Sequence, residues 1–204
     1  MKLKTRELMH ELRHHLPFAI VATVVGIVIA FILKYYLGNF SKLENSFEFL
    51  HVLHISVSAI VSSGIYYKYR KKIMPSLLIG IISSIVVGSL SDAIFPYLGS
   101  IIFNINTTFH FPLLEMPFII ISGALLGSVI GISLGFTKLP HFGHVLVSTF
   151  ASLFYLLAFT GTITIWVFIG GFVITIFAVL IPCCFSDIIF PFLFMGEKIK
   201  HCNC

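Results

Sequence analysis

The chain has 204 residues, of which 58% are hydrophobic and only 10% are charged. A soluble domain of this size cannot bury that much apolar surface, so the composition excludes a soluble globular protein and predicts that lipid surrounds most of the chain. The formal net charge of +5 comes from Lys and Arg residues that flank the apolar runs, so no nucleic-acid-binding surface is expected.

Six apolar runs follow one another, each long enough to cross a bilayer, which takes about 17–25 helical residues. No clear small-residue cleavage site follows the first run, so we expect it to be retained rather than removed as a signal peptide. The expected fold class is therefore an all-α integral membrane protein with six transmembrane helices. In chain order the runs cover roughly residues 16–36, 50–66, 74–98, 116–136, 143–160 and 163–194.

The positive charges predict the orientation of these helices. Eleven of the 13 Lys and Arg residues fall in the N-terminal segment, the second and fourth connections and the C-terminal tail. Only Lys34 and Lys42 fall on the other side. Because cytoplasmic loops are enriched in Lys and Arg, we expect a multi-pass protein of the plasma membrane with both termini in the cytoplasm.

Three motifs occur twice and in the same order, which indicates an internal duplication. The octapeptides SDAIFPYL (91–98) and SDIIFPFL (186–193) agree at six of eight positions and contain the only two aspartates in the chain. A second motif, His-x2-His-x3-Ser-x3-Ser, begins at His51 and again at His141. In the third, His10, His15, Pro17 and Phe18 correspond to His110, Glu115, Pro117 and Phe118.

The duplication predicts the domain organisation. A unit of three spans crosses the membrane an odd number of times, so the second copy must run in the opposite direction to the first. Inverted repeats of this kind are typical of secondary transporters, which bind their substrates at the repeat interface. The expected units are a first three-helix repeat with an N-terminal juxtamembrane segment (1–103), a second, inverted three-helix repeat (104–198) and a Cys/His tail (199–204).

The two aspartates stand beside predicted helix breaks. Asp92 lies four residues before Pro96, and Asp187 lies four residues before Pro191. A proline within a helix cannot donate a hydrogen bond to the carbonyl four residues earlier. Helices 3 and 6 are therefore expected to be broken at these prolines, with a free carbonyl beside each carboxylate. Inside a membrane such groups need a cation or water to satisfy them.

Histidine and carboxylate side chains at helical spacing are candidate ligands of a metal ion. On the expected topology each membrane face gathers one set of them. The outer set is His51, His54, Asp92, His110 and Glu115, and the cytoplasmic set is His10, His15, His141, His144 and Asp187. Weaker candidates are His14, Ser58, Ser148, Cys183, Cys184, His201, Cys202 and Cys204.

Structural roles compete with these assignments. A single histidine in a membrane helix is more often a hydrogen-bonding group between helices than a ligand, and an aspartate can cap a helix end. The histidines before the first span also fit a solvated juxtamembrane helix. Gly123, Gly127, Gly131 and Gly135 form a small-residue ridge. Such a ridge lets helices approach closely, and it is also a candidate surface for a homodimer.

The function expected from this pattern is transport of a divalent transition-metal ion of the zinc, manganese or iron class through symmetric sites on the two faces. Nitrogen and oxygen ligands disfavour calcium and the alkali ions. One alternative is a membrane-embedded metalloenzyme, either a histidine-cluster oxygenase or a hydrolase with a metal-bound water. Another is a proton-linked carrier or a structural membrane protein with static metal sites. A transporter is favoured over an enzyme because the histidines are divided between two faces.

Overall fold

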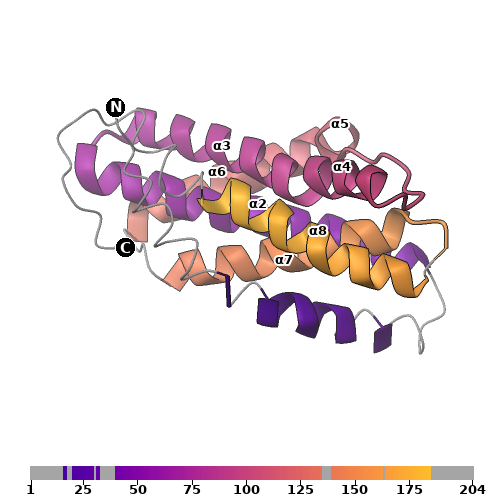
Figure 1. Ribbon diagram of the computed structural model, residues 1–204. Helices are drawn as coiled ribbons and strands as arrows, with labels where there is room; N and C mark the ends of the chain where they lie inside the picture. The colour runs from indigo at the N-terminus through magenta and orange to yellow at the C-terminus, as the bar shows by residue number, and fades with distance from the viewer. Residues whose placement is uncertain are drawn as a thin grey trace.

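The chain folds into a bundle of helices in the computed structural model, as Figure 1 shows. The structure describes residues 16–17, 20–29, 31–32, 40–134, 139–162 and 164–184. Within these ranges there is no β-strand, and the only extended pairing is a single bridge between Thr107 and Thr160. The prediction of an all-α protein is therefore confirmed.

Among the described residues, four segments are long and apolar enough to cross a membrane: Leu43–Arg70, Ile73–Ile102, Pro117–Leu134 and Ile165–Pro182. By length and composition they identify the chain as a membrane protein. Shorter apolar helices cover Ile20–Ile29 and Gly143–Phe159. The helices are α2 (Phe40–Arg70), α3 (Ile73–Ser89), the π-helical turn η1 (Leu90–Ile94), α4 (Phe95–Ile102), α5 (Pro112–Glu115), α6 (Pro117–Leu134), α7 (Leu139–Phe159) and α8 (Ile165–Cys184).

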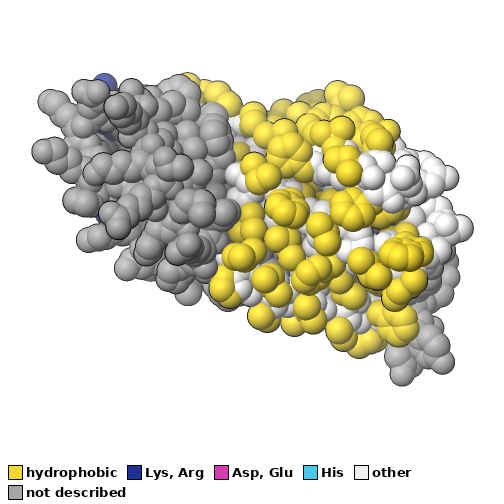
Figure 2. All heavy atoms as spheres, in the orientation of Figure 1, with side chains coloured by type: hydrophobic (Ala, Val, Ile, Leu, Met, Phe, Trp, Pro, Cys, Tyr) yellow, Lys and Arg dark blue, Asp and Glu magenta, His cyan; other side chains and the backbone are white. Residues whose placement is uncertain are grey.

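Apolar side chains cover the outside of the bundle and many polar side chains lie inside it. Hydrophobic groups fill the described part of the face in Figure 2, and Leu114, Phe118 and Leu126 are among the most exposed residues. In contrast, histidine, serine and aspartate side chains on α2, η1 and α7 are fully buried. This distribution is that of a protein whose surrounding solvent is lipid and whose interior contains a polar site.

Helix α2 lies at the centre and packs against α3, α6 and α7. Its contact with α6 depends on the glycine ridge, because a Cβ added at Gly127 or Gly131 would overlap the carbonyl oxygens of Ser56 and Ile60. The ridge therefore lets two helices of one chain approach closely. Since α2 fills it, these glycines do not present a surface to a second copy, and Gly135 lies outside the described residues.

Helix α2 is longer than the sequence predicts. The second span was expected over 50–66, but α2 begins at Phe40 and ends at Arg70. His51 is 11 residues and His54 is 14 residues after Phe40, which corresponds to about 17 and 21 Å along the helix axis. These histidines therefore lie well inside the bundle, not at the start of a span.

The break predicted at Pro96 takes a different form. The helical path continues from α3 through η1 into α4, and the Phe95 N–H donates to the Leu90 carbonyl, five residues earlier. Asp92 lies within this π turn, and Pro96 follows in the first turn of α4, where a proline needs no N–H partner. A π turn inside an α-helix is frequent at functional sites. The second predicted break, at Pro191, lies outside the described residues.

Candidate functional site

The carboxylate of Asp92 is the centre of a fully buried polar cluster. One oxygen, Oδ2, is 2.9 Å from His51 Nδ1 and 2.7 Å from His54 Nδ1. The other oxygen, Oδ1, accepts hydrogen bonds from the hydroxyls of Ser91, at 2.6 Å, and Ser148, at 3.2 Å. An ionised carboxylate can only accept hydrogen bonds, so in these pairs each Nδ1 carries a proton.

Three segments of the chain position this cluster. His51 and His54 are three residues apart on α2 and so project from one face of the helix. The π turn η1 presents Asp92 to that face. Helix α7 holds the turn through its backbone as well, because the Ser152 hydroxyl donates to the Ser91 carbonyl at 2.8 Å. Side chains from α2, η1 and α7 therefore meet at one site.

The ring nitrogens that face away from Asp92 are the reactive atoms of the cluster. His51 Nε2 and His54 Nε2 are buried and have no hydrogen-bond partner among the residues that the structure describes. With the proton on Nδ1, each Nε2 has a lone pair. A carboxylate behind Nδ1 and a free Nε2 in front is the arrangement of metal-binding histidines in proteins. The two rings can therefore bind a cation or accept a proton.

Among the residues that the structure describes, no Lys or Arg side chain pairs with Asp92. Its ion-pair partners are the two imidazoles, which are charged only when protonated. An unbalanced carboxylate is costly inside a membrane, and such residues mark ion or proton pathways. A proton or a metal ion bound to the imidazoles would neutralise it.

His144 and Ser148 belong to this cluster, although His144 was predicted to lie at the opposite face of the membrane from His51 and His54. The His144 ring is fully buried and stacks on the His54 ring, with centroids 4.7 Å apart and planes inclined by 24°. Ser148 bonds to Asp92, as described above. Ser58, the other weaker candidate whose side chain is described, is buried on the face of α2 that carries His51 and His54.

His110 and Glu115 form a separate pair near α5. His110 Nδ1 is 2.9 Å from Glu115 Oε1, and 52% of the Glu115 side chain is exposed. The buried Phe47 ring lies between the pair and the cluster, with its centroid 5.9 Å from that of His110 and 5.6 Å from that of His51. Across the described ranges, no group of three His, Cys, Asp or Glu side chains is placed to hold a metal ion together.

The remaining candidates cannot be placed. His10, His14, His15, Asp187, His201, Cys202 and Cys204 lie outside the described residues, and the side chains of His141, Cys183 and Cys184 are also outside them.

Sequence reasoning missed the aromatic residues around the site. Phe47 is fully buried, and its ring also contacts that of Tyr155, whose hydroxyl accepts a hydrogen bond from the His110 backbone N–H at 3.2 Å. Phe47 is four residues before His51 and so lies on the same face of α2. That spacing was the available signal, but Phe47 lies between Ser46 and Glu48, before the apolar run expected over 50–66, so the sequence placed it outside the helix.

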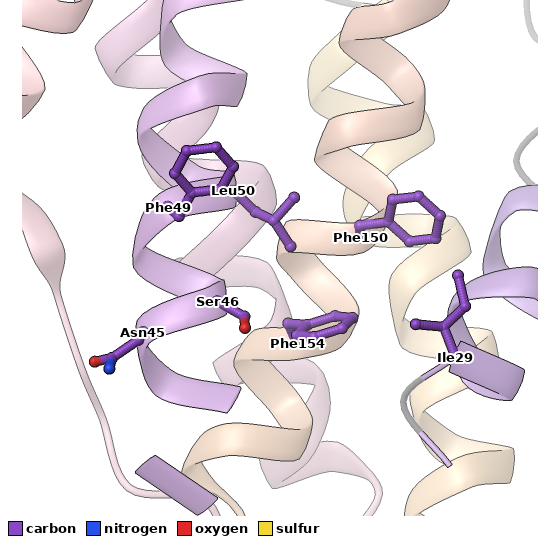
Figure 3. Close-up of a pocket in the computed structure, with 7 residues that line it drawn as sticks. All are labelled: Ile29, Asn45, Ser46, Phe49, Leu50, Phe150 and Phe154. Carbon is purple, nitrogen blue, oxygen red and sulfur yellow. The ribbon is translucent and has the colours of Figure 1, made fainter. Parts of the chain in front are cut away.

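A cavity away from the Asp92 cluster has a mainly apolar lining. A cavity of about 420 Å³ is lined by Phe49 and Leu50 of α2, Phe150 and Phe154 of α7, and Ile29, as Figure 3 shows. Among its described lining residues, Asn45 and Ser46 have the polar side chains and none is titratable.

The Asp92 cluster is therefore the candidate functional site. It combines a buried carboxylate, two imidazoles with a free nitrogen and a helix that changes its hydrogen-bonding pattern at the aspartate. Its histidine, serine and aspartate side chains are fully buried in the bundle. No protein-family model, curated protein or solved structure matches the chain.

Proposed function

We propose that the protein is a membrane transporter for a divalent transition-metal ion of the zinc, manganese or iron class, and that the Asp92 cluster is its cation site. One observation carries this proposal: Asp92 is fully buried, and its partners among the described residues are imidazole and hydroxyl groups. The described residues supply no fixed positive charge to this carboxylate, so a mobile one, a metal ion or a proton, would neutralise it.

In this proposal His51 and His54 bind the ion through Nε2, and Asp92 supplies negative charge and fixes the orientation of both rings. Nitrogen ligands backed by a carboxylate favour zinc and its neighbours over calcium or magnesium, which prefer oxygen. Water or the neighbouring His144 ring would complete the coordination. The enclosed site also favours transport over catalysis, since an enzyme needs room for its substrate beside the metal.

The architecture proposed for this function is a six-helix inverted repeat with both termini in the cytoplasm. Helix contacts of the two halves support it. Gly26 of the N-terminal helix packs against Phe150 and Leu153 of α7, while Gly131 of α6 packs against Ile60 and Ser63 of α2. Phe150 follows Ile60, and Leu153 follows Ser63, by the same 90 residues that separate His51 from His141. Positions 150 and 153 of α7 therefore correspond to positions 60 and 63 of α2, although the two glycines do not correspond, since the offset of 100 residues matches Gly26 with Leu126.

A proton-linked carrier is the second candidate, and a specific observation favours it. Both carboxylate oxygens of Asp92 are already engaged by hydrogen bonds, and the described part of the chain offers no third metal ligand in place. A proton on one imidazole would neutralise the cluster without any rearrangement, whereas a metal ion requires the rings to converge.

Flux measurements distinguish the two candidates. The full chain is reconstituted in liposomes, and uptake of Zn²⁺, Mn²⁺ or Fe²⁺ is followed, one ion at a time, with a metal-sensitive dye inside. We expect uptake by the native chain, loss of uptake in Asp92→Asn, and retention in Glu44→Gln, which alters an exposed carboxylate on the same helix. Metal uptake that survives Asp92→Asn contradicts the proposed site. Proton flux without metal flux indicates the carrier.

A further inference from the structure

Two buried serines of α2 differ from most serines in the described helices. A serine hydroxyl inside a helix commonly donates to the carbonyl three or four residues earlier. The neighbouring Ser63 does so, with its Oγ 2.6 Å from the Ala59 carbonyl oxygen. Ser58 and Ser62 are fully buried, yet neither Oγ has a hydrogen-bond partner among the residues that the structure describes. The backbone bond is also made by Ser56, Ser76, Ser83, Ser84, Ser100, Ser122, Ser128 and Ser133.

These two hydroxyls extend a row of polar atoms that have no partner. Ser58 and Ser62 follow His54 at intervals of four residues, so they lie on its face of α2, about 6 and 12 Å further along the helix axis. Nε2 of His51 and Nε2 of His54, on the same face, are also buried without a hydrogen-bond partner. Buried polar atoms nearly always have a partner, so four on one helix face indicate a place for a polar guest.

The corresponding serines of α7 are used in a different way. The Ser148 hydroxyl donates to the Asp92 carboxylate at 3.2 Å, and the Ser152 hydroxyl donates to the Ser91 carbonyl at 2.8 Å. In α7 the motif therefore fixes the π turn that carries the carboxylate. In α2 the same two motif positions hold nothing of the described chain, so their oxygens remain available to a ligand.

Apolar side chains close the row at both ends. Phe47 lies four residues before His51, and Ile65 lies three residues after Ser62, so both continue the same face of α2. Both side chains are buried, and Ile65 packs in an apolar cluster with Val61. The polar row is thus shut off above and below, as required of a transporter that opens its site to one face of the membrane at a time.

We infer that Ser58 and Ser62 line the route by which the cation moves between the imidazoles of His51 and His54 and the end of α2 at Arg70. Their hydroxyl oxygens replace part of the water around a divalent transition-metal ion. A neutral oxygen holds such an ion less firmly than an imidazole supported by a carboxylate, so these positions conduct the ion instead of retaining it. The inference rests on the proposed function for the identity of the ion, but access of an ion to these two positions is measurable without transport.

Cysteine accessibility tests the route. In the full chain with its four native cysteines replaced by serine, Ser58→Cys, Ser62→Cys and Ser63→Cys are each reconstituted in liposomes and exposed to Ag⁺. Thiols that remain are counted with a maleimide after unfolding. Ser63 is the matched control, because its hydroxyl bonds to the carbonyls of Ala59 and Ser128 between α2 and α6. We expect cysteines at 58 and 62 to react several-fold faster than the one at 63, and equal rates would overturn the inference.

Alanine variants test the route where a cysteine variant does not fold. Ser58→Ala and Ser62→Ala remove no bond to the described chain, so their midpoints of thermal unfolding should not fall below that of the native chain, whereas Ser63→Ala should lower it. A decrease equal to that of Ser63→Ala would reveal a structural partner and overturn the inference.

Zinc measurements on the same variants separate the route from the binding site. Uptake into liposomes should slow several-fold in Ser58→Ala and Ser62→Ala, while the equilibrium zinc affinity stays that of the native chain, because the imidazole ligands are intact. An unchanged uptake rate, or a loss of affinity in its place, would overturn the inference. Absence of uptake by the native chain contradicts the proposed function, and the Ag⁺ reaction then still decides whether an ion reaches the two serines.

Discussion

The rings of His54 and His144 stack with their centroids 4.7 Å apart, although the two residues are 90 positions apart in the sequence. They occupy the same place in the two copies of one motif, so the contact joins the copies at equivalent points. It also brings the second copy's Ser148 within 3.2 Å of Asp92. The relationship between these two histidines therefore defines the candidate site as one shared between both halves.

The hydrogen bond from Ser148 to Asp92 is expected to stabilise the fold. Ser148→Ala removes a donor to a buried carboxylate, which should lower the free energy of unfolding by about 1–3 kcal/mol. The measurement is thermal or denaturant unfolding in detergent. Ser133→Ala is the matched control, because the Ser133 hydroxyl is exposed on α6 and should change stability by less than about 0.5 kcal/mol. Equal effects of the two changes would contradict the role assigned to Ser148.

Asp92 is expected to act on metal affinity through the two histidines. Its oxygens contact Nδ1 of both rings, so Asp92→Asn leaves the Nε2 atoms in place but weakens the support behind them. Loss of such support typically lowers affinity about 10- to 100-fold. Titration of the purified protein with Zn²⁺ measures this change, with Glu44→Gln as the control. Unchanged zinc affinity in Asp92→Asn would show that the ion binds elsewhere.

Phe47 is expected to separate the two polar regions. Its buried ring contacts His51 on one side and His110 on the other. Phe47→Ala should lower the free energy of unfolding by about 3–5 kcal/mol, because it leaves a cavity. In liposomes Phe47→Leu, which keeps most of the apolar volume, should increase passive proton leak. Phe49→Ala, on the exposed side of the same helix, should neither lower the free energy of unfolding by that amount nor increase the proton leak. If Phe47→Leu leaks protons no faster than the native chain, a barrier role for Phe47 is excluded.

The glycine ridge of α6 is expected to tolerate no larger side chain. Gly127→Leu places atoms where the backbone of α2 lies, so α2 and α6 must separate, and the overpacking should cost at least about 1–3 kcal/mol. Gly143→Ala is the control, because nothing lies within 4 Å of the added carbon. In a helix that change should stabilise by up to about 1 kcal/mol. Comparable unfolding midpoints for both variants would argue against the close approach.

The sequence was informative about each helix taken alone. Long apolar runs predicted membrane helices, and glycines at intervals of four predicted a close helix contact, which α2 and α6 make. Spacing of three and four residues also predicted that His51 and His54 share one face of a helix. The extra turns of α2 before residue 50 could not be predicted from hydropathy, because Lys42, Glu44 and Asn45 are polar although they are helical.

Only the tertiary structure decided where these faces meet. Periodicity determines which side of a helix is polar, but not which neighbour it faces or at what depth. The early start of α2 moves His51 and His54 inward, and the packing of α7 against α2 brings His144 and Ser148 to the same level. The π turn at Asp92 also depends on its neighbours, since hydroxyls from α7 hold its backbone and its carboxylate. Local sequence determined the helices and their polar faces, whereas contacts between distant segments determined that one buried site would form from α2, η1 and α7.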